Sequence, residues 1–501
     1  MTKIFRILWL IAALLAFAST AAAQIETHSF YSEALHRVAT YSIYVPRDLK
    51  ENERLPSLYI LHGAYGSYAD WPTLSNVDQL AKRYRMILIF PDGAQFGWYV
   101  DSKLEKYSNY ETFISDELRK YIDAHYPTID SRGARAIMGL SMGGHGALSL
   151  AAKHPDLYGS ASSLSGILKL TNHPTHWSIP SRLGDFATHE AEWKANSVYD
   201  LAENFRTGNV SILFDCGVDD TKTGAIVDAR DLDAHLKELK IPHIYRELPG
   251  THSWDYWKDN LQEHLNFHQA KMLAATPGAE KWFAFYYDRI GKFLEENAAL
   301  SIEGPSTTPT LCLLGSSSMQ GMPSDMFPQF RVFNRGISAD RLGVGSRGIS
   351  QRLEESALDM KPDVIFLKCA RNDVAARYAS HTPNPTDDEL AEITTSIINR
   401  IHERLPNTLI IIGDAFPVRD KYAHLAPSIA VFAERQRAIA KELNIPLVDG
   451  QKALIGEDGL LKPENSADGL HLSKAGKQIV ADMILEEIKK SRPALLTKGA
   501  P

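Results

Sequence analysis

Short apolar runs alternate with longer helical patterns from residue 55 onward, and this alternation limits the possible folds more than any other feature. Runs at residues 57–61, 86–90 and 134–138 each lead directly into a loop that contains glycine. Such runs are typical of strands buried on both faces, and their alternation with helices predicts a mostly parallel sheet covered by helices. Because ligands bind beyond the carboxyl ends of such strands, we expect functional residues in these loops.

A break in the periodicity divides the chain in two. The chain has 501 residues, several times the length of a typical domain of about 150 residues. Residues 274–278 read Ala-Ala-Thr-Pro-Gly and interrupt the pattern. We therefore predict one α/β domain over residues 24–275 and a smaller three-layer α/β domain over residues 276–501. The strands expected in the second domain are residues 310–314, 331–333, 363–368, 408–412 and 446–448.

The first 23 residues have the layout of a secretory signal. Lys3 and Arg6 precede an apolar run from residue 7 to about residue 18, and residues 21–23 are all alanine. The apolar run is shorter than the ~20 residues that a membrane-spanning helix needs. We therefore predict a cleaved signal peptide over residues 1–23, a secreted or periplasmic protein and no stable membrane insertion. A retained anchor is the alternative.

Composition argues against several kinds of partner. The 54 Lys and Arg residues against 61 Asp and Glu residues give a formal charge of -7, so no basic field attracts nucleic acid. Cys216, Cys312 and Cys369 each lie in an apolar run, which predicts buried thiols and no disulfide framework. Neither H-E-x-x-H nor paired C-x-x-C motifs occur, so we expect no metal and no cofactor.

A glycine-flanked serine follows the third apolar run. Residues 139–143 read Gly-Leu-Ser-Met-Gly and precede a helical pattern. Glycines on both sides of Ser141 permit a turn too sharp for residues with a β-carbon, and this turn exposes the serine hydroxyl at the top of the sheet. The helix N-terminus that follows supplies free N–H groups for an oxyanion. The pattern predicts a nucleophile at Ser141.

Two later loops carry the partners that such a serine requires. A serine hydroxyl needs a base and a residue that orients the base. Asp219 and Asp220 follow one expected strand, and His252 follows the next. Since all three loops lie at carboxyl ends of strands, their side chains can meet Ser141 at one edge of the sheet. The spacing leaves open which aspartate is the acid.

These motifs resemble the esterase D-like group of α/β-hydrolases, which includes the feruloyl and acetylxylan esterases of carbohydrate esterase family 1. The resemblance implies an α/β-hydrolase fold with Ser141 as nucleophile, His252 as general base and Asp220 as its partner. Asp219 is the fallback for the acid. The resemblance covers about residues 40–265 and includes Leu61-His-Gly63, Trp71, Pro91-Asp-Gly93, Gly97-Trp-Tyr99, Tyr110-Glu111, residues 139–143 and residues 250–257.

The same resemblance implies where the oxyanion and the acyl group bind. The backbone N–H groups of Ala64 and Met142 would form the oxyanion hole. Four aromatic residues are candidates for a wall beside the acyl or sugar group, with core packing as the alternative. They are Trp98, Tyr99, Trp177 and Trp254.

Four further blocks follow the second alternation. They are Gly315-Ser316-Ser317-Ser318, Phe333-Asn-Arg-Gly336, Ala370-Arg-Asn372-Asp373 and Asp468-Gly-Leu-His471. One loop can carry both Asp468 and His471, so the histidine can deprotonate a serine hydroxyl. In this order the blocks resemble the SGNH, or GDSL-like, hydrolases across about residues 310–489.

The second resemblance implies a complete second site. It makes Ser317 the nucleophile and Asp468 and His471 the remaining pair. The Gly336 N–H and the Asn372 side chain would donate to the oxyanion together with the Ser317 N–H.

Two positions depart from that family's usual pattern. Ser316 stands where many members have aspartate, and Ala370 stands where glycine is usual. A methyl group beside the oxyanion could misalign the hole. A domain with the fold but little activity is the alternative.

Together the two constellations predict a carboxylic ester hydrolase of the feruloyl or acetylxylan esterase type. The expected substrate is an esterified polysaccharide or oligosaccharide such as xylan, and two triads would each form an acyl-enzyme. Alternatives are an acyltransferase or lipid esterase that uses the first site, or a carbohydrate-binding protein with one silent site.

Overall fold

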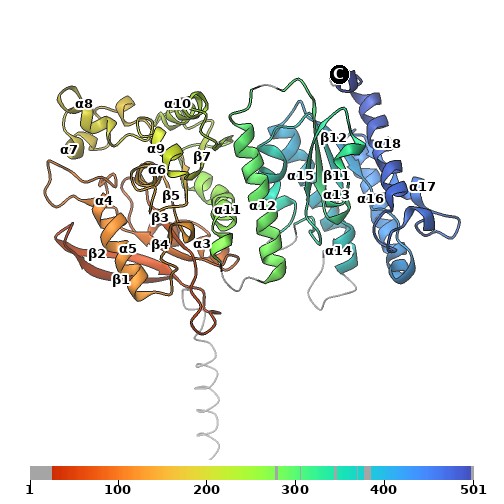
Figure 1. Cartoon of the computed structure of the whole chain (residues 1–501), viewed down its shortest axis with the longest axis horizontal. Helices are drawn as coiled ribbons and strands as arrows, with labels where there is room; N and C mark the ends of the chain where they lie inside the picture. Colours follow the sequence, from red (N-terminus) through yellow and green to blue (C-terminus); the bar gives the residue numbers. More distant parts are fainter. Residues whose placement is uncertain are drawn as a thin grey trace, which may run out of the picture. The chain divides into compact units, whose positions relative to one another are not determined.

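The computed structural model describes residues 25–276, 280–304, 306–343, 347–368, 370–376 and 385–497. The chain forms two compact units (Figure 1). The first contains the residues up to 241 and residues 245–279, and the second contains residues 242–244 and 280–501. The predicted signal peptide over residues 1–23 lies outside the described residues.

An eight-stranded sheet forms the centre of the first unit. Its strands are β1 (Ile25–Ser32), β2 (Arg37–Tyr44), β3 (Ser57–Leu61), β4 (Ile87–Pro91), β5 (Arg135–Leu140), β6 (Ser160–Leu164), β7 (Ser211–Gly217) and β8 (Ile244–Leu248), in the order β1-β2-β4-β3-β5-β6-β7-β8. Strands β4, β3, β5, β6 and β7 pair in parallel. The antiparallel β1–β2 hairpin, which joins β4 through β2, adds to the expected parallel pattern. Residues of β3, β4 and β5 are buried throughout because both faces are covered.

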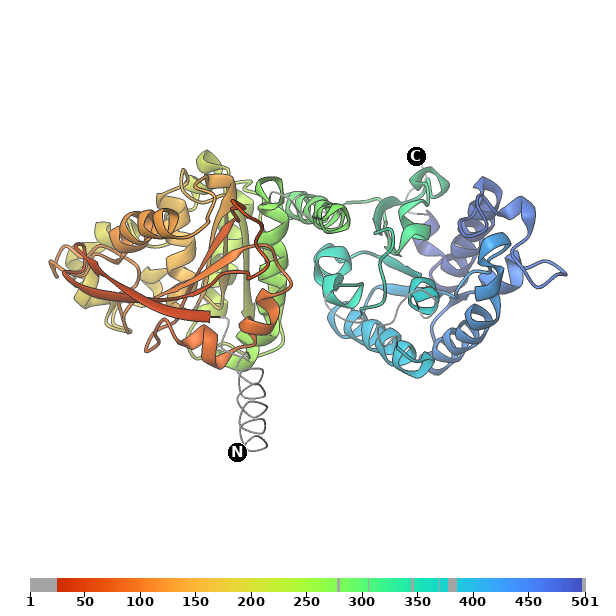
Figure 2. The same cartoon turned by 90° about the horizontal axis from the view of Figure 1, so that it is seen from below.

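Helices lie on both sides of this sheet (Figure 2). They are α2 (Asp70–Leu74), α3 (Val77–Ala81), α4 (Tyr110–Thr112), α5 (Arg119–His125), α6 (Met142–Lys153), α7 (Ile179–Leu183), α8 (Phe186–Lys194), α9 (Glu203–Gly208), α10 (Ala225–Glu238) and α11 (Trp254–Lys271). Helix α6 packs against β5 and β6 and is buried along almost its whole length. Helix α11 packs against β5, β6 and β7.

The second unit is built on a five-stranded parallel sheet in the order β10-β9-β11-β12-β13. The strands are β9 (Thr310–Gly315), β10 (Arg331–Gly336), β11 (Val364–Lys368), β12 (Leu409–Gly413) and β13 (Leu447–Val448). Its helices are α12 (Lys281–Leu300), α13 (Ser317–Gln320), α14 (Arg371–Ala376), α15 (Asp387–Arg404), α16 (Ala426–Glu442), α17 (Gly450–Leu454), α18 (Lys474–Ser491) and α19 (Ala494–Thr497).

Alternate residues of these strands enter two separate cores. Leu314, Ile365 and Ile412 pack with residues of α15 and α16, such as Ile397 and Phe432. Their strand neighbours Leu313, Phe366 and Ile411 pack instead with Val480 and Ile484 of α18. Since successive side chains of a strand point to opposite faces, helices cover both faces of the sheet. The predicted α/β class and three-layer second domain are confirmed.

One cysteine lies in the core of each unit, Cys216 in the first and Cys312 in the second. Cys216 and Cys312 are buried free thiols, as predicted, and burial raises the pKa of Cys312 to about 12. Cys369 lies outside the described residues. In the part of the chain that the structure describes, no helix has both the length and the apolar composition that crossing a bilayer requires.

Candidate active sites

Ser141 occupies a strained turn between β5 and α6. Its backbone has φ of 52° and ψ of -118°, a conformation that costs a residue with a β-carbon of order 1–3 kcal/mol. The flanking glycines are required by close approach. A β-carbon at Gly139 would lie 2.4 Å from the carbonyl oxygen of Gly143, and one at Gly143 would lie 2.5 Å from the backbone of Leu61 and His62. The turn therefore presents the serine hydroxyl at the carboxyl edge of the sheet.

A hydrogen-bonded chain of three side chains starts at Ser141. Its Oγ lies 2.8 Å from His252 Nε2, and His252 Nδ1 lies 2.6 Å from Asp220 Oδ2. Asp220 is buried and also accepts a hydrogen bond from Thr223. Asp219 is exposed, so of the two aspartates that the sequence left open, Asp220 is the one that contacts the imidazole.

Two glycines bring the aspartate and histidine loops together. A β-carbon at Gly217 would lie 2.3 Å from the carbonyl oxygen of Gly250. That oxygen accepts from the Asp219 N–H at 3.0 Å, and Gly250 has φ of 137°, which favours glycine. This contact sets the register between the loops that carry Asp220 and His252.

The loop after β3 directs the Ala64 N–H. His62 is buried and accepts from the Gly93 N–H through Nε2 at 2.8 Å, so its Nδ1 carries the proton and donates to the Gly63 carbonyl at 2.8 Å. Because the C=O and N–H of a trans peptide point in opposite directions, holding the Gly63 oxygen fixes the direction of the Ala64 N–H. Met142 is the first residue of α6, and its N–H has no acceptor within the helix. Both N–H groups are thus available to an oxyanion.

A cavity of about 310 Å³ opens beside Ser141. Trp98, Trp177 and Trp254 line it, as one of the two interpretations predicted, and Trp257 joins them. Trp98 Nε1 donates to the Trp177 carbonyl at 2.9 Å, which connects two of the walls. Tyr99 is fully buried, and its hydroxyl donates to the His62 carbonyl at 3.0 Å, so it packs in the core below the oxyanion loop.

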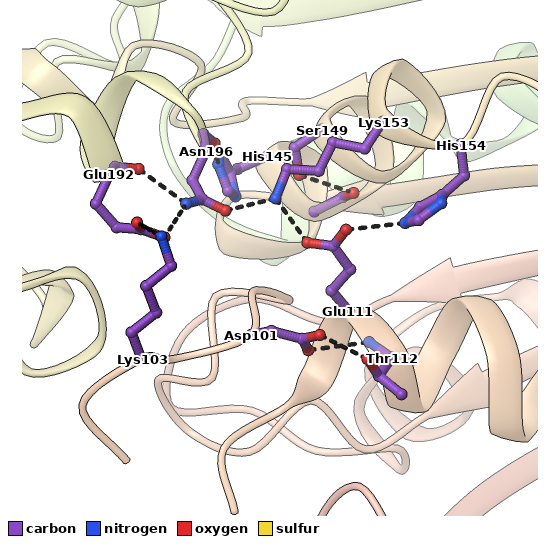
Figure 3. A network of polar contacts seen from close by, with 11 residues as sticks. Asp101, Lys103, Glu111, Thr112, His145, Ser149, Lys153, His154, Glu192 and Asn196 are labelled. Carbon is purple, nitrogen blue, oxygen red and sulfur yellow. Dashed lines mark hydrogen bonds and ion pairs between the residues drawn. The ribbon is translucent and has the colours of Figure 1, made fainter. Parts of the chain in front are cut away.

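A network of hydrogen bonds and ion pairs holds the chain segment that follows Trp177 against α6 (Figure 3). Lys153, at the end of α6, donates to Glu111 at 2.6 Å and to Asn196 at 2.5 Å. His154 contacts the other oxygen of Glu111 at 2.9 Å, and His145 Nε2 lies 2.7 Å from the Asn196 carbonyl. Burial lowers the pKa of His145 to about 4, so it is neutral at physiological pH. His145 and His154 are therefore structural residues of this network.

A second chain of the same three residue types lies in the second unit. Ser317 is the first residue of α13, two residues after the end of β9, and its Oγ lies 3.0 Å from His471 Nε2. His471 Nδ1 lies 2.8 Å from Asp468 Oδ2. Partial burial raises the pKa of Asp468, but hydrogen bonds from the His471 ring and from the backbone N–H groups of His471 and Leu470 outweigh it and hold that pKa well below its usual range. The carboxylate is therefore ionised at neutral pH.

Of the three oxyanion donors expected in this unit, one, the Gly336 N–H, differs from the prediction. The Gly336 N–H donates to Asn334 Oδ1 at 3.1 Å, and a β-carbon at Gly336 would lie 2.0 Å from the backbone nitrogen of Gln320. Gly336 is therefore required for close packing against the backbone of Gln320, and its N–H already donates to Asn334. Asn372 Nδ2 donates to the Asp340 carbonyl at 2.8 Å, which leaves its second amide hydrogen for another acceptor.

The turn after β10 offers another donor that the sequence did not reveal. Among residues 336–340, all within the described structure, the Ala339 N–H is the one without an acceptor, and Ala339 has φ of 61°. A positive φ at alanine is costly, which is typical of functional turns. The other N–H groups of the turn donate as follows: Ile337 to Gly315, Ser338 to Gln320 and Asp340 to Ile337.

Ala370 also has a left-handed backbone, with φ of 75°. This conformation explains why glycine is usual at the position, because an alanine there costs roughly 1 kcal/mol. The strain sits directly before Arg371 and Asn372, which begin α14.

Comparison with protein families agrees with both resemblances. Residues 32–268 match the family model Esterase, and residues 314–479 match the GDSL-like lipase/acylhydrolase family. The chain thus combines an esterase domain with a GDSL-like domain.

Individual relatives match the first unit. An acetyl esterase from Caldicellulosiruptor saccharolyticus is 28% identical over 249 residues, which are 46% of this chain and 92% of the relative. An S-formylglutathione hydrolase from Mus musculus is 28% identical over 47% of this chain and 89% of its own. Among solved structures, a ferulic acid esterase from Anaeromyces mucronatus has 20% identity and a TM-score of 0.36, and the match covers 47% of this chain and 87% of that one. The esterase and acylhydrolase families identify a carboxylic ester hydrolase.

Proposed function

We propose that this carboxylic ester hydrolase is an exported enzyme that removes feruloyl or acetyl esters, or both, from plant polysaccharide such as xylan, with a separate catalytic triad in each unit. The observation that carries the proposal is that each unit contains its own hydrogen-bonded serine, histidine and aspartate. The apolar run at the N-terminus of the sequence supports export.

In the first unit, His252 would act as the base for Ser141. Asp220 holds the proton on Nδ1 of His252, so that Nε2 accepts the proton of the serine hydroxyl as Oγ attacks the ester carbonyl. The Ala64 and Met142 N–H groups would stabilise the oxyanion. The protonated imidazole then gives its proton to the departing sugar oxygen, which leaves as a hydroxyl, and water, activated by the same imidazole, releases the acid from the acyl-enzyme.

The side chains that line the first cavity favour a substrate with an aromatic acyl group. Trp98, Trp177, Trp254 and Trp257 offer ring faces and edges against which a phenylpropenoyl ring can pack. An acetyl group would fill little of the cavity, so this site suits the feruloyl ester better than the acetyl ester.

In the second unit, His471 would serve Ser317 in the same way, oriented by Asp468. We assign the oxyanion to the N–H groups of Ser317 and Ala339 and to the second amide hydrogen of Asn372. The second site is more open than the first, since the side chain of Asp468 is 50% exposed while that of Asp220 is fully buried. Acetyl esters, which need no deep acyl pocket, are the substrates we propose for it.

Release of ferulate and acetate from substituted xylan tests the proposal. Ser141→Ala should lower the rate of ferulate release, and Ser317→Ala the rate of acetate release, each by at least about 10³-fold. A fluorophosphonate probe should label the wild type at both serines and each variant at one. Unchanged release in both variants would show that neither serine is a nucleophile.

An acceptor sugar separates hydrolysis from acyl transfer. If the first site transfers acyl groups, adding xylo-oligosaccharide should divert ferulate from free acid to a new sugar ester. We expect free acid as the main product.

A further inference from the structure

We propose that Arg371 is a positioning residue of the second site, which holds the loop that carries His471 against the helix that carries Ser317. The inference rests on the proposed function of Ser317. It concerns a side chain that neither the motif nor the family comparison assigns to the site.

One guanidinium joins two of the four sequence blocks. Arg371 Nη1 donates to the Leu470 carbonyl at 2.7 Å, and Nη2 contacts Ser318 Oγ at 3.3 Å. Leu470 lies between Asp468 and His471 in the chain, and Ser318 directly follows Ser317. The backbone on either side of the Ser317–His471 hydrogen bond is therefore connected through Arg371.

The burial of Arg371 indicates that this connection is rigid. The side chain is only 2% exposed, and it stands at the start of α14, directly after the strained Ala370. An arginine fork fixes the angle between its two acceptors, which a lysine amine does not. The guanidinium can thus set the distance between two loops that are otherwise separate in sequence.

The groups around Arg371 leave its guanidinium positively charged, as this role requires. The Asp468 carboxylate and the Tyr422 phenol are the groups that act on it electrostatically. Burial lowers the pKa of Arg371 to about 10, so it remains a cation at neutral pH. The cation lies near the carboxylate that orients His471 and favours its ionised form.

Kinetics in a Ser141→Ala background, which isolates the second site, test the proposal. We expect Arg371→Met to lower kcat for a small acetyl ester by about 10²-fold, the cost of misplacing a catalytic group by about 1 Å, with KM changed less than threefold. Arg371→Lys should recover part of the loss. Adding methylguanidinium to Arg371→Ala should restore kcat, because the ion refills the vacated site.

Arg437→Met is the matched control. Arg437 is an arginine of the same unit that pairs with Asp414 and Asp449. Its replacement can lower stability but should leave kcat within twofold. Circular dichroism of each variant checks that it is folded.

The outcomes separate two kinds of failure. If fluorophosphonate does not label Ser317 in the wild type, the second site is silent and the role of Arg371 falls with it. If Ser317 reacts equally fast in wild type and Arg371→Met, the proposed function stands and the positioning role is wrong. A rise in KM alone, or failure of methylguanidinium to restore a folded Arg371→Ala variant, also overturns the positioning role.

Discussion

The phenol of Tyr256 donates a hydrogen bond of 2.8 Å to the buried carboxylate of Asp215. The other oxygen of Asp215 lies 2.7 Å from His264 Nε2, and both carboxylate and imidazole are fully buried. Asp215 belongs to β7, which leads to Asp220, while Tyr256 and His264 belong to α11, which follows His252. The buried network therefore joins the two elements that flank the loops of Asp220 and His252.

Tyr256→Phe removes the donor to Asp215 Oδ1 without changing the ring. Since a buried carboxylate oxygen then loses a hydrogen bond, we expect the free energy of unfolding of the first unit to fall by about 1–3 kcal/mol. We also expect kcat at Ser141 to fall severalfold. Urea denaturation and ester hydrolysis measure these effects, with Tyr31→Phe, at an exposed hydrogen bond to His36, as the control. Equal stability of both variants would contradict the prediction.

Asp220→Asn and Asp219→Asn test which of the two neighbouring aspartates orients His252. The two residues differ in that Asp220 contacts the imidazole. Only Asp220 contacts His252, so its amide variant should favour the wrong imidazole tautomer and lower kcat at the first site by about 10⁴-fold. Asp219→Asn should stay within about twofold. Ferulate ester hydrolysis in a Ser317→Ala background measures both, and a larger loss for Asp219→Asn would reverse the assignment.

Ala370→Gly relieves a left-handed backbone in the second unit. At φ of 75° glycine has no β-carbon to strain, so we expect the second unit to gain about 0.5–1 kcal/mol of stability. Ala375→Gly, within α14, should instead lose up to about 1 kcal/mol. The urea dependence of hydrogen exchange in peptides from β11 and β12 reports the second unit alone. A loss of stability in Ala370→Gly would show that the methyl group is needed there.

In the second unit, the roles of Ser317, Asp468 and His471 follow from the resemblance to the SGNH hydrolases. In the first unit, the fold and the meeting of Ser141, His252 and an aspartate could be predicted because loops at the carboxyl ends of parallel strands converge. The buried runs located those loops, and glycines at positions 139 and 143 marked the sharp turn. The antiparallel β1–β2 hairpin was not foreseen, since its exposed residues show no apolar run.

The oxyanion donors were harder to predict from the sequence, because the type of a residue does not determine the direction of its backbone N–H. Gly336 has the residue type expected of a donor, yet the side chain of Asn334 occupies its N–H. The free N–H belongs to Ala339, which no motif marks. Likewise Tyr99 and Trp98 are adjacent, but one packs below the oxyanion loop while the other lines the cavity.

The buried carboxyl of Asp373 predicts a pH-dependent stability of the second unit. Burial raises the pKa of Asp373 to about 7, although the hydrogen bond from the Leu342 N–H acts to lower it. Since the unfolded value is about 4, the folded state holds a proton that the unfolded state releases between about pH 4 and pH 7. This stabilisation is present below pH 4 and is lost as pH rises to 7, by about 1–3 kcal/mol.

Asp373→Asn should reduce this pH dependence, because the amide mimics the protonated acid at every pH. Part of the dependence should remain, since burial also raises the pKa of Asp414 to about 7. Hydrogen exchange of β11 and β12 peptides in urea, at pH 4.5 and 7.5, measures the difference in stability. Asp482→Asn, at an exposed position of α18, should keep the wild-type slope. Identical slopes in wild type and Asp373→Asn would mean that Asp373 is ionised throughout this range.

Tyr65→Ala tests whether the polymer lies over the mouth of the first cavity. Tyr65 follows Ala64, lines the cavity and is 71% exposed, and its ring packs edge-on against Phe96 at 4.6 Å. The proposed polysaccharide substrate cannot enter about 310 Å³, so its sugar ring would lie outside, where the Tyr65 ring can stack on it.

We therefore expect Tyr65→Ala to lower kcat/KM about tenfold for feruloylated xylan and less than twofold for methyl ferulate. Tyr65→Trp should preserve both values, and Tyr107→Ala, at an exposed tyrosine that does not line the cavity, should change neither. An equal loss on both substrates would instead show that Tyr65 acts through the Ala64 N–H, because only a disturbed oxyanion loop affects the small ester as strongly as the polymer.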